Sequence, residues 1–282
     1  LKAQIGADKV FDLSLGNPVV DPPEAFYQEL KCLVERPVHG MHRYMPNAGY
    51  IETRDAVAHQ LTIETALPFQ SADVVMCVGA GGGLNTVLHA LLDPGDEVVV
   101  FAPYFVEYLY YIQNHNGVLV VAPCAVGFVP DMDALASRIT RRTKAIIVNS
   151  PNNPTGVVYS QNFLAALGRV LQDAERRFGR QIFLVSDEPY RKLLYDGLPY
   201  PHIYSHHIHS IAVTSHSKDL GLPGERIGYI SVNPDCPRKS LPPGRCAHLP
   251  PIAPEHAGVR PLDRQQSPFH STTQTPPRGF RS

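Results

Sequence analysis

The strongest constraint on the fold is an alternation of short β-branched runs with longer segments of helical period, which extends from Val74 to Val232. This alternation predicts an α/β domain with a mainly parallel sheet. The runs are apolar along their whole length, which is typical of strands covered on both faces, so we expect three α/β/α layers around seven strands. The expected strands are Val74–Val78, Glu97–Phe101, Val118–Val121, Lys144–Val148, Gln181–Val185, Ser210–Thr214 and Gly228–Val232. The helices expected between them, from apolar residues three and four apart, are Leu84–Leu92, Val106–Asn114, Met132–Ile139 and Gln161–Phe178.

The chain divides into three parts by its patterning. Residues 1–50 form an N-terminal segment with one clear helix, Glu24–Glu35, and residues 51–236 form the large domain, which opens with a helix from Ile51 to about Glu64. Residues 237–282 hold ten of the 27 prolines and seven basic residues against two acidic ones. We expect this tail to be disordered; a natural low-complexity tail and an altered reading frame or splice give the same composition. Because the first residue is Leu1, we also expect the chain to start within a longer one.

Charge and cysteine usage limit the classes of partner and compartment. The formal net charge of −1 gives no reason to expect nucleic acid or an anionic membrane as a partner, and the apolar stretches are too short to cross a bilayer. The five cysteines are far apart, without a CxxC pair, which favours a reducing compartment such as the cytoplasm. A small-molecule substrate fits these properties best.

The most informative motif follows the strand that ends at Thr214. It is the string SHSKDLGLPGERIGY, residues 215–229. A partly desolvated lysine at the end of a buried strand can form an imine with an aldehyde, which makes Lys218 a candidate nucleophile; serine hydroxyls and the guanidinium of Arg226 suit a phosphate ester. The alternative is a surface loop with an ordinary salt-bridged lysine.

The whole string resembles the lysine motif of class I and II aminotransferases, enzymes of fold type I that depend on pyridoxal 5′-phosphate (PLP). The resemblance implies that Lys218 holds PLP as a Schiff base. It also implies that Ser215, Ser217 and Arg226 contact the PLP phosphate.

Two further motifs extend the resemblance. The sequence NSPNNPTG, residues 149–156, is similar to the family's Asn-Pro-Thr-Gly loop, which implies that Asn153 binds the phenolic oxygen of PLP and lies near the substrate. The strand Gln181–Val185 leads into SDEPY, where Asp187 is the expected partner of the pyridine nitrogen and Tyr190 a second contact to the phenolic oxygen. Taken singly, the first motif could be a plain turn and Asp187 a helix cap.

The glycine-rich segment after the strand Val74–Val78 is a candidate phosphate cradle. It places Ala80, Gly81 and Gly82 before a helix, where free backbone N–H groups bind anions. A dinucleotide-binding loop is the competing interpretation, but the spacing is not GxGxxG, and a P-loop lysine is absent. In the family an aromatic residue after the next strand stacks on the PLP ring, which implies Phe105, with Tyr104 as the other possibility; a core role is the alternative.

Near the start, two short matches concern the substrate and the dimer. Gly16 belongs to a segment that resembles the family's substrate loop, and Tyr44 matches the tyrosine that reaches the phosphate of the neighbouring subunit. The resemblance thus implies a homodimer and places part of the family's small domain within residues 1–50.

Four histidines between Pro199 and the strand at Ser210 could suggest a metal site. They are His202, His206, His207 and His209. Because no cysteine or carboxylate completes a coordination sphere at suitable spacing, we predict a histidine-rich surface loop without a metal.

The resemblance covers about Asp12 to Cys236 and implies transfer of an amino group between an amino acid and a 2-oxo acid, with Lys218, Asp187 and Tyr190 as catalytic residues. The family's C-terminal small domain, with its carboxylate-binding arginine, has no clear counterpart, so the small domain is expected to be incomplete. Two alternatives stay open. These are a PLP-dependent C–S or related lyase on the same fold, and a catalytically inactive isoform that binds PLP.

Overall fold

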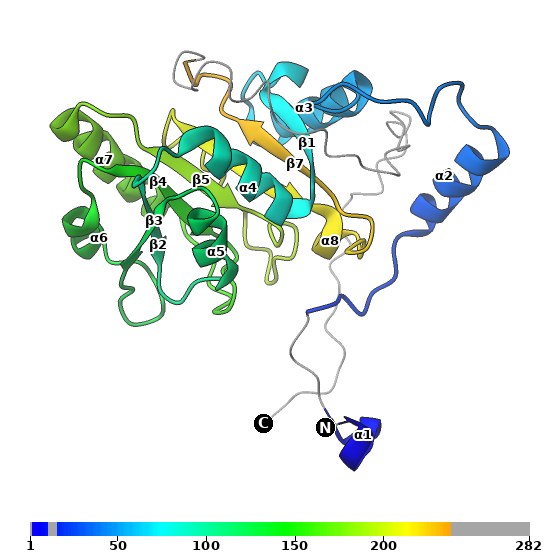
Figure 1. The fold of residues 1–282 in the computed structure, drawn as a ribbon, viewed down its shortest axis with the longest axis horizontal. Coiled ribbons are helices and arrows are strands. Elements are labelled where there is room, and N and C mark those ends of the chain that lie inside the picture. Colours follow the sequence, from blue (N-terminus) through cyan, green and yellow to red (C-terminus); the bar gives the residue numbers. More distant parts are fainter. Residues whose placement is uncertain (1, 11–15, 238–282) are drawn as a thin grey trace.

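The structure, a computed structural model, describes residues 2–10 and 16–237, and these contain one seven-stranded sheet, drawn in Figure 1. Its strands lie in the order β1-β7-β6-β5-β4-β2-β3, and β7 runs opposite to the other six. The strands are β1 Val74–Val78, β2 Glu97–Phe101, β3 Val118–Ala122, β4 Thr143–Asn149, β5 Phe183–Asp187, β6 Ser210–Ser215 and β7 Ile227–Val232. The prediction of a mainly parallel seven-stranded sheet is confirmed.

Helices cover both faces of the sheet, which confirms the three α/β/α layers (Figure 1). Helices α4 and α5 pack on one face, and α3, α6 and α7 pack on the other. The helices are α1 Lys2–Ile5, α2 Glu24–Glu35, α3 Ile51–Thr65, α4 Gly79–Leu91, α5 Glu107–Gln113, α6 Met132–Arg138, α7 Gln161–Phe178 and α8 His216–Asp219.

The alternation of side chains along each strand divides the core into two halves. In β2, Val98 and Val100 pack under α4 and α5, whereas Val99 and Phe101 face α7. The strands in the middle of the sheet are buried throughout, as their apolar sequences predict. The expectation is wrong for β3, an edge strand in which Val118 and Val121 are exposed.

Helix α4 begins five residues earlier than its apolar pattern predicts. We expected the helix to start at Leu84 after a glycine-rich loop, but Ala80, Gly81 and Gly82 form its first turn. Because glycine has a low helix propensity, the sequence does not indicate this start. Packing explains the glycines, since a methyl group added to Gly83 would lie 2.5 Å from Cγ1 of Val213 in β6.

Local signals fix the long helix α7 well. The hydroxyl of Ser160 accepts a hydrogen bond from the backbone N–H of Phe163, and Gly179 ends the helix in the left-handed conformation. Its apolar residues fall on one face and are buried on the sheet. The predicted bounds of this helix are therefore confirmed.

The N-terminal segment joins the core only in part. Helix α3 buries Ala58 and Leu61, whereas α2 has no buried residue and stands apart from the sheet (Figure 1). The expected disordered tail lies outside the described residues, apart from Pro237. Within residues 2–10 and 16–237, no helix combines the length and hydropathy that a membrane crossing requires.

Candidate active site

The carboxyl ends of three adjacent parallel strands bring polar side chains together. Strand β4 ends at Asn149, β5 at Asp187 and β6 at Ser215. Asn149 pairs with Asp187 across β4 and β5, and Asp187 pairs with Val213 in β6. Open α/β sheets bind their ligands at the carboxyl ends of the strands, so this edge is the expected location of a site.

Asp187 is buried, and among the described residues only one of its carboxylate oxygens has a donor. The hydroxyl of Tyr108 in α5 donates to Oδ2 at 2.6 Å. Among the described residues, none donates a hydrogen bond to Oδ1, although this atom is shielded from solvent. Burial raises the pKa of Asp187 to about 7, the bond from Tyr108 opposes this rise, and the nearby Glu188 adds to it. A carboxylate in this state attracts a cationic N–H donor, because such a donor would both satisfy Oδ1 and favour the ionised form.

Asn149 links this carboxylate to the predicted Asn153 loop. Its side-chain nitrogen donates to the backbone oxygen of Asp187 at 2.9 Å, and its side-chain oxygen accepts from the backbone N–H of Asn153 at 2.6 Å. The structure therefore brings Asn153 and Asp187 to one end of the sheet. Sequence reasoning gave neither Asn149 nor Tyr108 a role; the position of Tyr108 one helical turn after Phe105 was the available signal.

Lys218 lies in α8, directly beyond β6. Its ammonium group donates to the backbone oxygen of Gly16, so the predicted substrate loop and the predicted nucleophile are in contact. Burial, and then the charge of Arg226, lower the pKa of Lys218. Ser215, at the end of β6, and Ser217, within α8, are both buried. A lysine whose pKa is lowered spends more time as the free amine, the form that attacks an aldehyde.

The first turn of α4 and Arg226 form a cationic corner beside this lysine. Gly79 has a φ of +62°, and a methyl group added to it would lie 2.6 Å from Nη2 of Arg226. Only glycine lets the guanidinium come this close to the helix. Free N–H groups at Ala80, Gly81 and Gly82 and the guanidinium are the donors that an anion such as a phosphate ester requires.

The two predicted aromatic contacts lie at the same end of the sheet. Phe105 is partly buried and meets Tyr108 edge to face, with ring centroids 5.6 Å apart. Tyr190 is partly buried, and burial and the charge of Asp187 raise its pKa, which keeps the hydroxyl protonated as a donor.

Tyr44 is the predicted site residue that the chain does not bring to this edge. Its side chain is fully exposed. A role through a neighbouring subunit agrees with this position, and a role within its own subunit does not.

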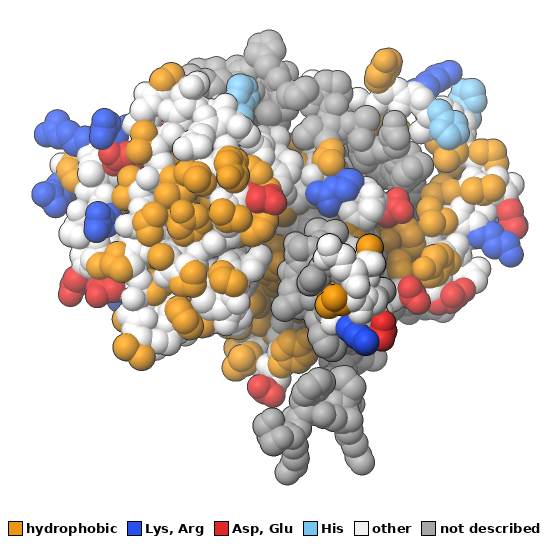
Figure 2. Space-filling model, turned by 60° about the horizontal axis from the view of Figure 1, so that its bottom comes forward, with side chains coloured by type: hydrophobic (Ala, Val, Ile, Leu, Met, Phe, Trp, Pro, Cys, Tyr) orange, Lys and Arg blue, Asp and Glu red, His pale blue; other side chains and the backbone are white. Residues whose placement is uncertain are grey.

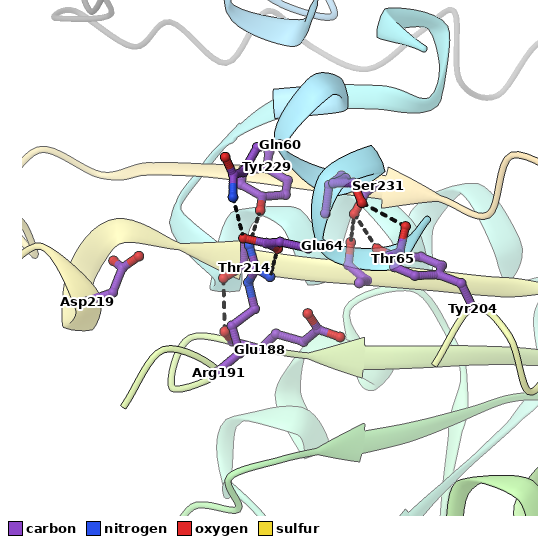
Figure 3. A network of polar contacts seen from close by, with 12 residues as sticks. Gln60, Glu64, Thr65, Glu188, Arg191, Tyr204, Thr214, Asp219, Tyr229 and Ser231 are labelled. Atoms are coloured by element: carbon purple, nitrogen blue, oxygen red, sulfur yellow. Dashed lines mark hydrogen bonds and ion pairs between the residues drawn. The ribbon is translucent and has the colours of Figure 1, made fainter. Parts of the chain in front are cut away.

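A network of ion pairs and hydrogen bonds holds the loop that follows Asp187 in place (Figure 3). Arg191 pairs with Glu64 of α3 at 2.5 Å and donates to the hydroxyl of Tyr229 in β7 at 2.8 Å. The hydroxyl of Thr214 binds the backbone oxygen of Glu188 at 2.9 Å. These contacts tie α3, β6 and β7 to the loop that follows Asp187. Sequence spacing could not reveal them, because Glu64 and Arg191 are 127 residues apart.

The histidine-rich segment is not the surface loop that we predicted, because His207 and His209 are buried. The fold also supplies a carboxylate that sequence spacing missed: Glu175 of α7 lies 2.8 Å from Nδ1 of His209. The potential ligand atoms of these three residues lie within 4.8 Å of one another. Hydrogen bonds already occupy these atoms. The carboxylate of Glu175 accepts from the backbone N–H of Ile182, and Nε2 of His207 donates to the backbone oxygen of Ile182. This cluster therefore fastens α7 to the start of β5 and to β6.

Comparison with known proteins agrees with this geometry. The fold is that of the PLP-dependent transferases of fold type I. The family model for aminotransferase class I and II matches residues 8–278, a match that continues past Cys236, where the motifs recognised in the sequence end. The chain belongs to the class I and II aminotransferase family, whose members depend on PLP.

Relatives and solved structures cover most of the chain. It is 36% identical over 219 residues to the aspartate/prephenate aminotransferase of Thermus thermophilus. This alignment covers 77% of this chain and 54% of the relative. It is 32% identical over 228 residues to the aspartate aminotransferase of Geobacillus stearothermophilus, covering 79% and 56%. The crystal structure of an aminotransferase from Eubacterium rectale superposes with a TM-score of 0.80 at 37% identity, covering 83% of this chain and 60% of that one. The chain thus spans about half the length of the curated relatives that it matches.

The residues at the sheet edge fit PLP. The unmatched Oδ1 of Asp187 suits a protonated pyridine nitrogen, and Lys218 suits the aldehyde. The first turn of α4 and Arg226 suit the phosphate.

Proposed function

We propose that this chain supplies the PLP-binding large domain of an aminotransferase that moves an amino group between an amino acid and a 2-oxo acid. The observation that carries the proposal is the buried, half-satisfied carboxylate of Asp187 at the end of β5, with Lys218 just beyond the adjacent β6. Backbone packing alone gives no reason to bury this carboxylate with one oxygen unpaired, because that arrangement costs free energy. A cationic ring nitrogen would offset the cost.

When bound, PLP supplies an electrophilic aldehyde and a ring that accepts electrons from the substrate. Asp187 holds a proton on the ring nitrogen, which keeps the ring a good electron acceptor. Lys218 would hold the cofactor aldehyde through its amine, and the same amine, when free, would accept a proton from the substrate Cα and donate it again. Tyr190 and Asn153 donate hydrogen bonds to the phenolic oxygen.

The remaining predicted residues bind and orient. Ser215, Ser217 and Arg226, with the first turn of α4, hold the phosphate. Phe105 would pack against the ring of the cofactor. The contact between Lys218 and the backbone of Gly16 supports a place for the Gly16 loop beside the amino acid.

We also infer a homodimer in the cytoplasm. The exposed apolar side chains of the N-terminal part, among them Val19, Val34 and Tyr44, favour a surface that a second subunit covers. Figure 2 shows hydrophobic side chains gathered in broad patches on one face of the molecule. The described cysteines are all free thiols, which agrees with a reducing compartment. Because the relatives are aspartate and aspartate/prephenate aminotransferases, aspartate is the amino donor to test first.

The test begins with cofactor attachment. The purified chain is mixed with PLP, reduced with borohydride, digested and examined by mass spectrometry. We expect a pyridoxyl group on Lys218, and we expect Lys218→Ala to lose both this adduct and the visible absorbance of the lysine-bound cofactor. Lys31→Ala, at an exposed position of α2, is the matched control and should behave like the unaltered chain. Attachment to another lysine, or none at all, would overturn the assignment.

The reaction type is tested by product analysis. With aspartate and a 2-oxo acid, amino transfer yields a new amino acid and the 2-oxo acid of aspartate. Elimination products without a new amino acid would instead indicate a lyase.

A further inference from the structure

A tyrosine of α5 reaches into the cationic corner, although no sequence motif assigns it a role. A methyl group added to Gly81 would lie 2.9 Å from the hydroxyl oxygen of Tyr111. Gly81 is in the first turn of α4, the turn whose N–H groups are free to bind an anion. The Tyr111 hydroxyl therefore lies beside Gly81 of this turn, and the guanidinium of Arg226 lies beside Gly79.

The hydroxyl of Tyr111 is oriented by a carboxylate of its own helix. It donates a hydrogen bond to Glu107, one turn earlier in α5. Burial and the adjacent Glu107 raise the pKa of Tyr111, and the more distant charge of Asp187 adds to this rise, whereas Arg226 opposes it. The charges of both Asp187 and Arg226 therefore act on this hydroxyl, which stays protonated and able to donate a hydrogen bond.

A tyrosine hydroxyl has a single proton to donate. In the free protein Glu107 receives it. A phosphate ester placed on the first turn of α4 would be a second acceptor beside the same hydroxyl, and a stronger one, because it carries up to two negative charges. The phosphate would also meet the negative charge of Glu107, which opposes its binding.

We propose that Tyr111 is an additional phosphate-binding residue and that Glu107 competes with the cofactor phosphate for the Tyr111 hydroxyl. This inference rests on the proposed function, because it assumes that PLP binds at the first turn of α4. It assigns opposite effects to two side chains that touch each other: Tyr111 strengthens phosphate binding, and Glu107 weakens it.

The opposition separates the proposal from a structural explanation. If the pair only stabilised α5, removal of either partner would weaken the site in the same direction. If the two groups compete, Tyr111→Phe lowers the affinity for PLP about tenfold, the usual effect of losing one hydrogen bond to a charged group. Glu107→Gln, which keeps the shape and removes the charge, raises the affinity several-fold.

The experiment titrates the cofactor-free chain of residues 1–282 with PLP and, separately, with pyridoxal, which lacks the phosphate. Binding is followed by the absorbance of the lysine-bound form, so the readout does not depend on turnover. We expect both substitutions to change the affinity for PLP and to leave the affinity for pyridoxal within about twofold. Tyr110→Phe, on an exposed position of the same helix, is the matched control and should change neither. Thermal unfolding checks that each variant is folded.

Three outcomes overturn the inference. Equal PLP affinities of Tyr111→Phe and the unaltered chain remove Tyr111 from the phosphate site, and a parallel loss for pyridoxal shows that the substitution acts on the ring or on the fold. Weaker PLP binding by Glu107→Gln shows that the carboxylate supports the site instead of competing for it. If the unaltered chain forms no adduct with PLP at all, the proposed function itself fails, and this inference falls with it.

Discussion

The buried Asp187 should make the cofactor-free protein less stable at neutral pH than a neutral variant. Its carboxylate is 5% exposed and has one oxygen without a donor among the described residues. The substitution Asp187→Asn keeps the shape and the bond from Tyr108, and it removes the charge. We therefore expect the variant to be more stable than the unaltered chain when PLP is absent.

The size and sign of this effect follow from the pKa. The folded value is about 7 and the ordinary value is 3.8, so between these two pH values the folded chain binds more protons at this site than the unfolded chain does. Stability is lost as the pH rises through this window, at about 1.4 kcal/mol per pH unit, and the loss is complete above pH 7 at about 4 kcal/mol. The buried amide of the variant has an N–H group without an acceptor, which costs about 1 kcal/mol. A net gain of about 3 kcal/mol is expected above pH 7.

The assay is urea unfolding of the cofactor-free proteins at pH 5 and pH 8. The stability difference should be less than about 1 kcal/mol at pH 5 and about 3 kcal/mol at pH 8. Asp55→Asn, at an exposed position of α3, should change stability by less than about 0.5 kcal/mol at both pH values. An equal difference at the two pH values would refute the reasoning. The same substitution should weaken PLP binding, because the ring nitrogen loses its carboxylate partner.

Three further substitutions test the surroundings of the site. Tyr108→Phe removes the bond that opposes the rise in the pKa of Asp187, so absorbance titration should show PLP affinity reduced about tenfold. Gly168→Ala places a methyl group 2.1 Å from the backbone oxygen of His206, and urea unfolding should show a loss of about 2 kcal/mol or more. Arg191→Met leaves buried carboxylates without their cation, and the same assay should show a loss of about 3 kcal/mol, with little dependence on salt.

Matched substitutions serve as controls for these three. Gly224→Ala adds its methyl group where no atom lies within 4 Å and should leave stability nearly unchanged. Arg176→Met breaks an exposed pair with Asp173 and should cost less than about 0.5 kcal/mol. Tyr110→Phe removes an exposed hydroxyl and should not affect PLP binding. A loss in a control equal to that of its counterpart would contradict the assigned cause.

The sequence predicts the layered fold well because the apolar runs of the central strands have a single physical explanation. Strands β1 and β2 have the predicted bounds, and α2 and α7 do also. The exposed face of β3 could not be predicted, because the order of strands decides which one lies at the edge. The start of α4 could not be predicted either. Its Gly83 packs against Val213, a residue distant in sequence, and the local pattern does not show this contact.

The site is predictable where a residue acts through its own local motif. Asp187 ends β5, Lys218 lies just beyond β6 and Arg226 directly precedes β7, so the local strings single them out as candidates. Contacts between distant elements give Tyr108, Asn149 and Glu175 their roles, and local sequence does not show such contacts. The turn α8, which carries Lys218, is too short for periodicity to detect.

The reversed strand β7 has a consequence for the order in which the chain can assemble. It is inserted between β6 and β1, and β1 pairs with no other described strand. On a ribosome, β1 and the helix behind it emerge early and must wait for residues 227–232 before they gain a hydrogen-bonded neighbour. Closing a loop of this length is entropically costly, so joining the two ends of the sheet is a late step of folding. Gly79 and Arg226 meet only at that step, so we expect the cationic corner to be complete only when nearly all of the domain has been synthesised.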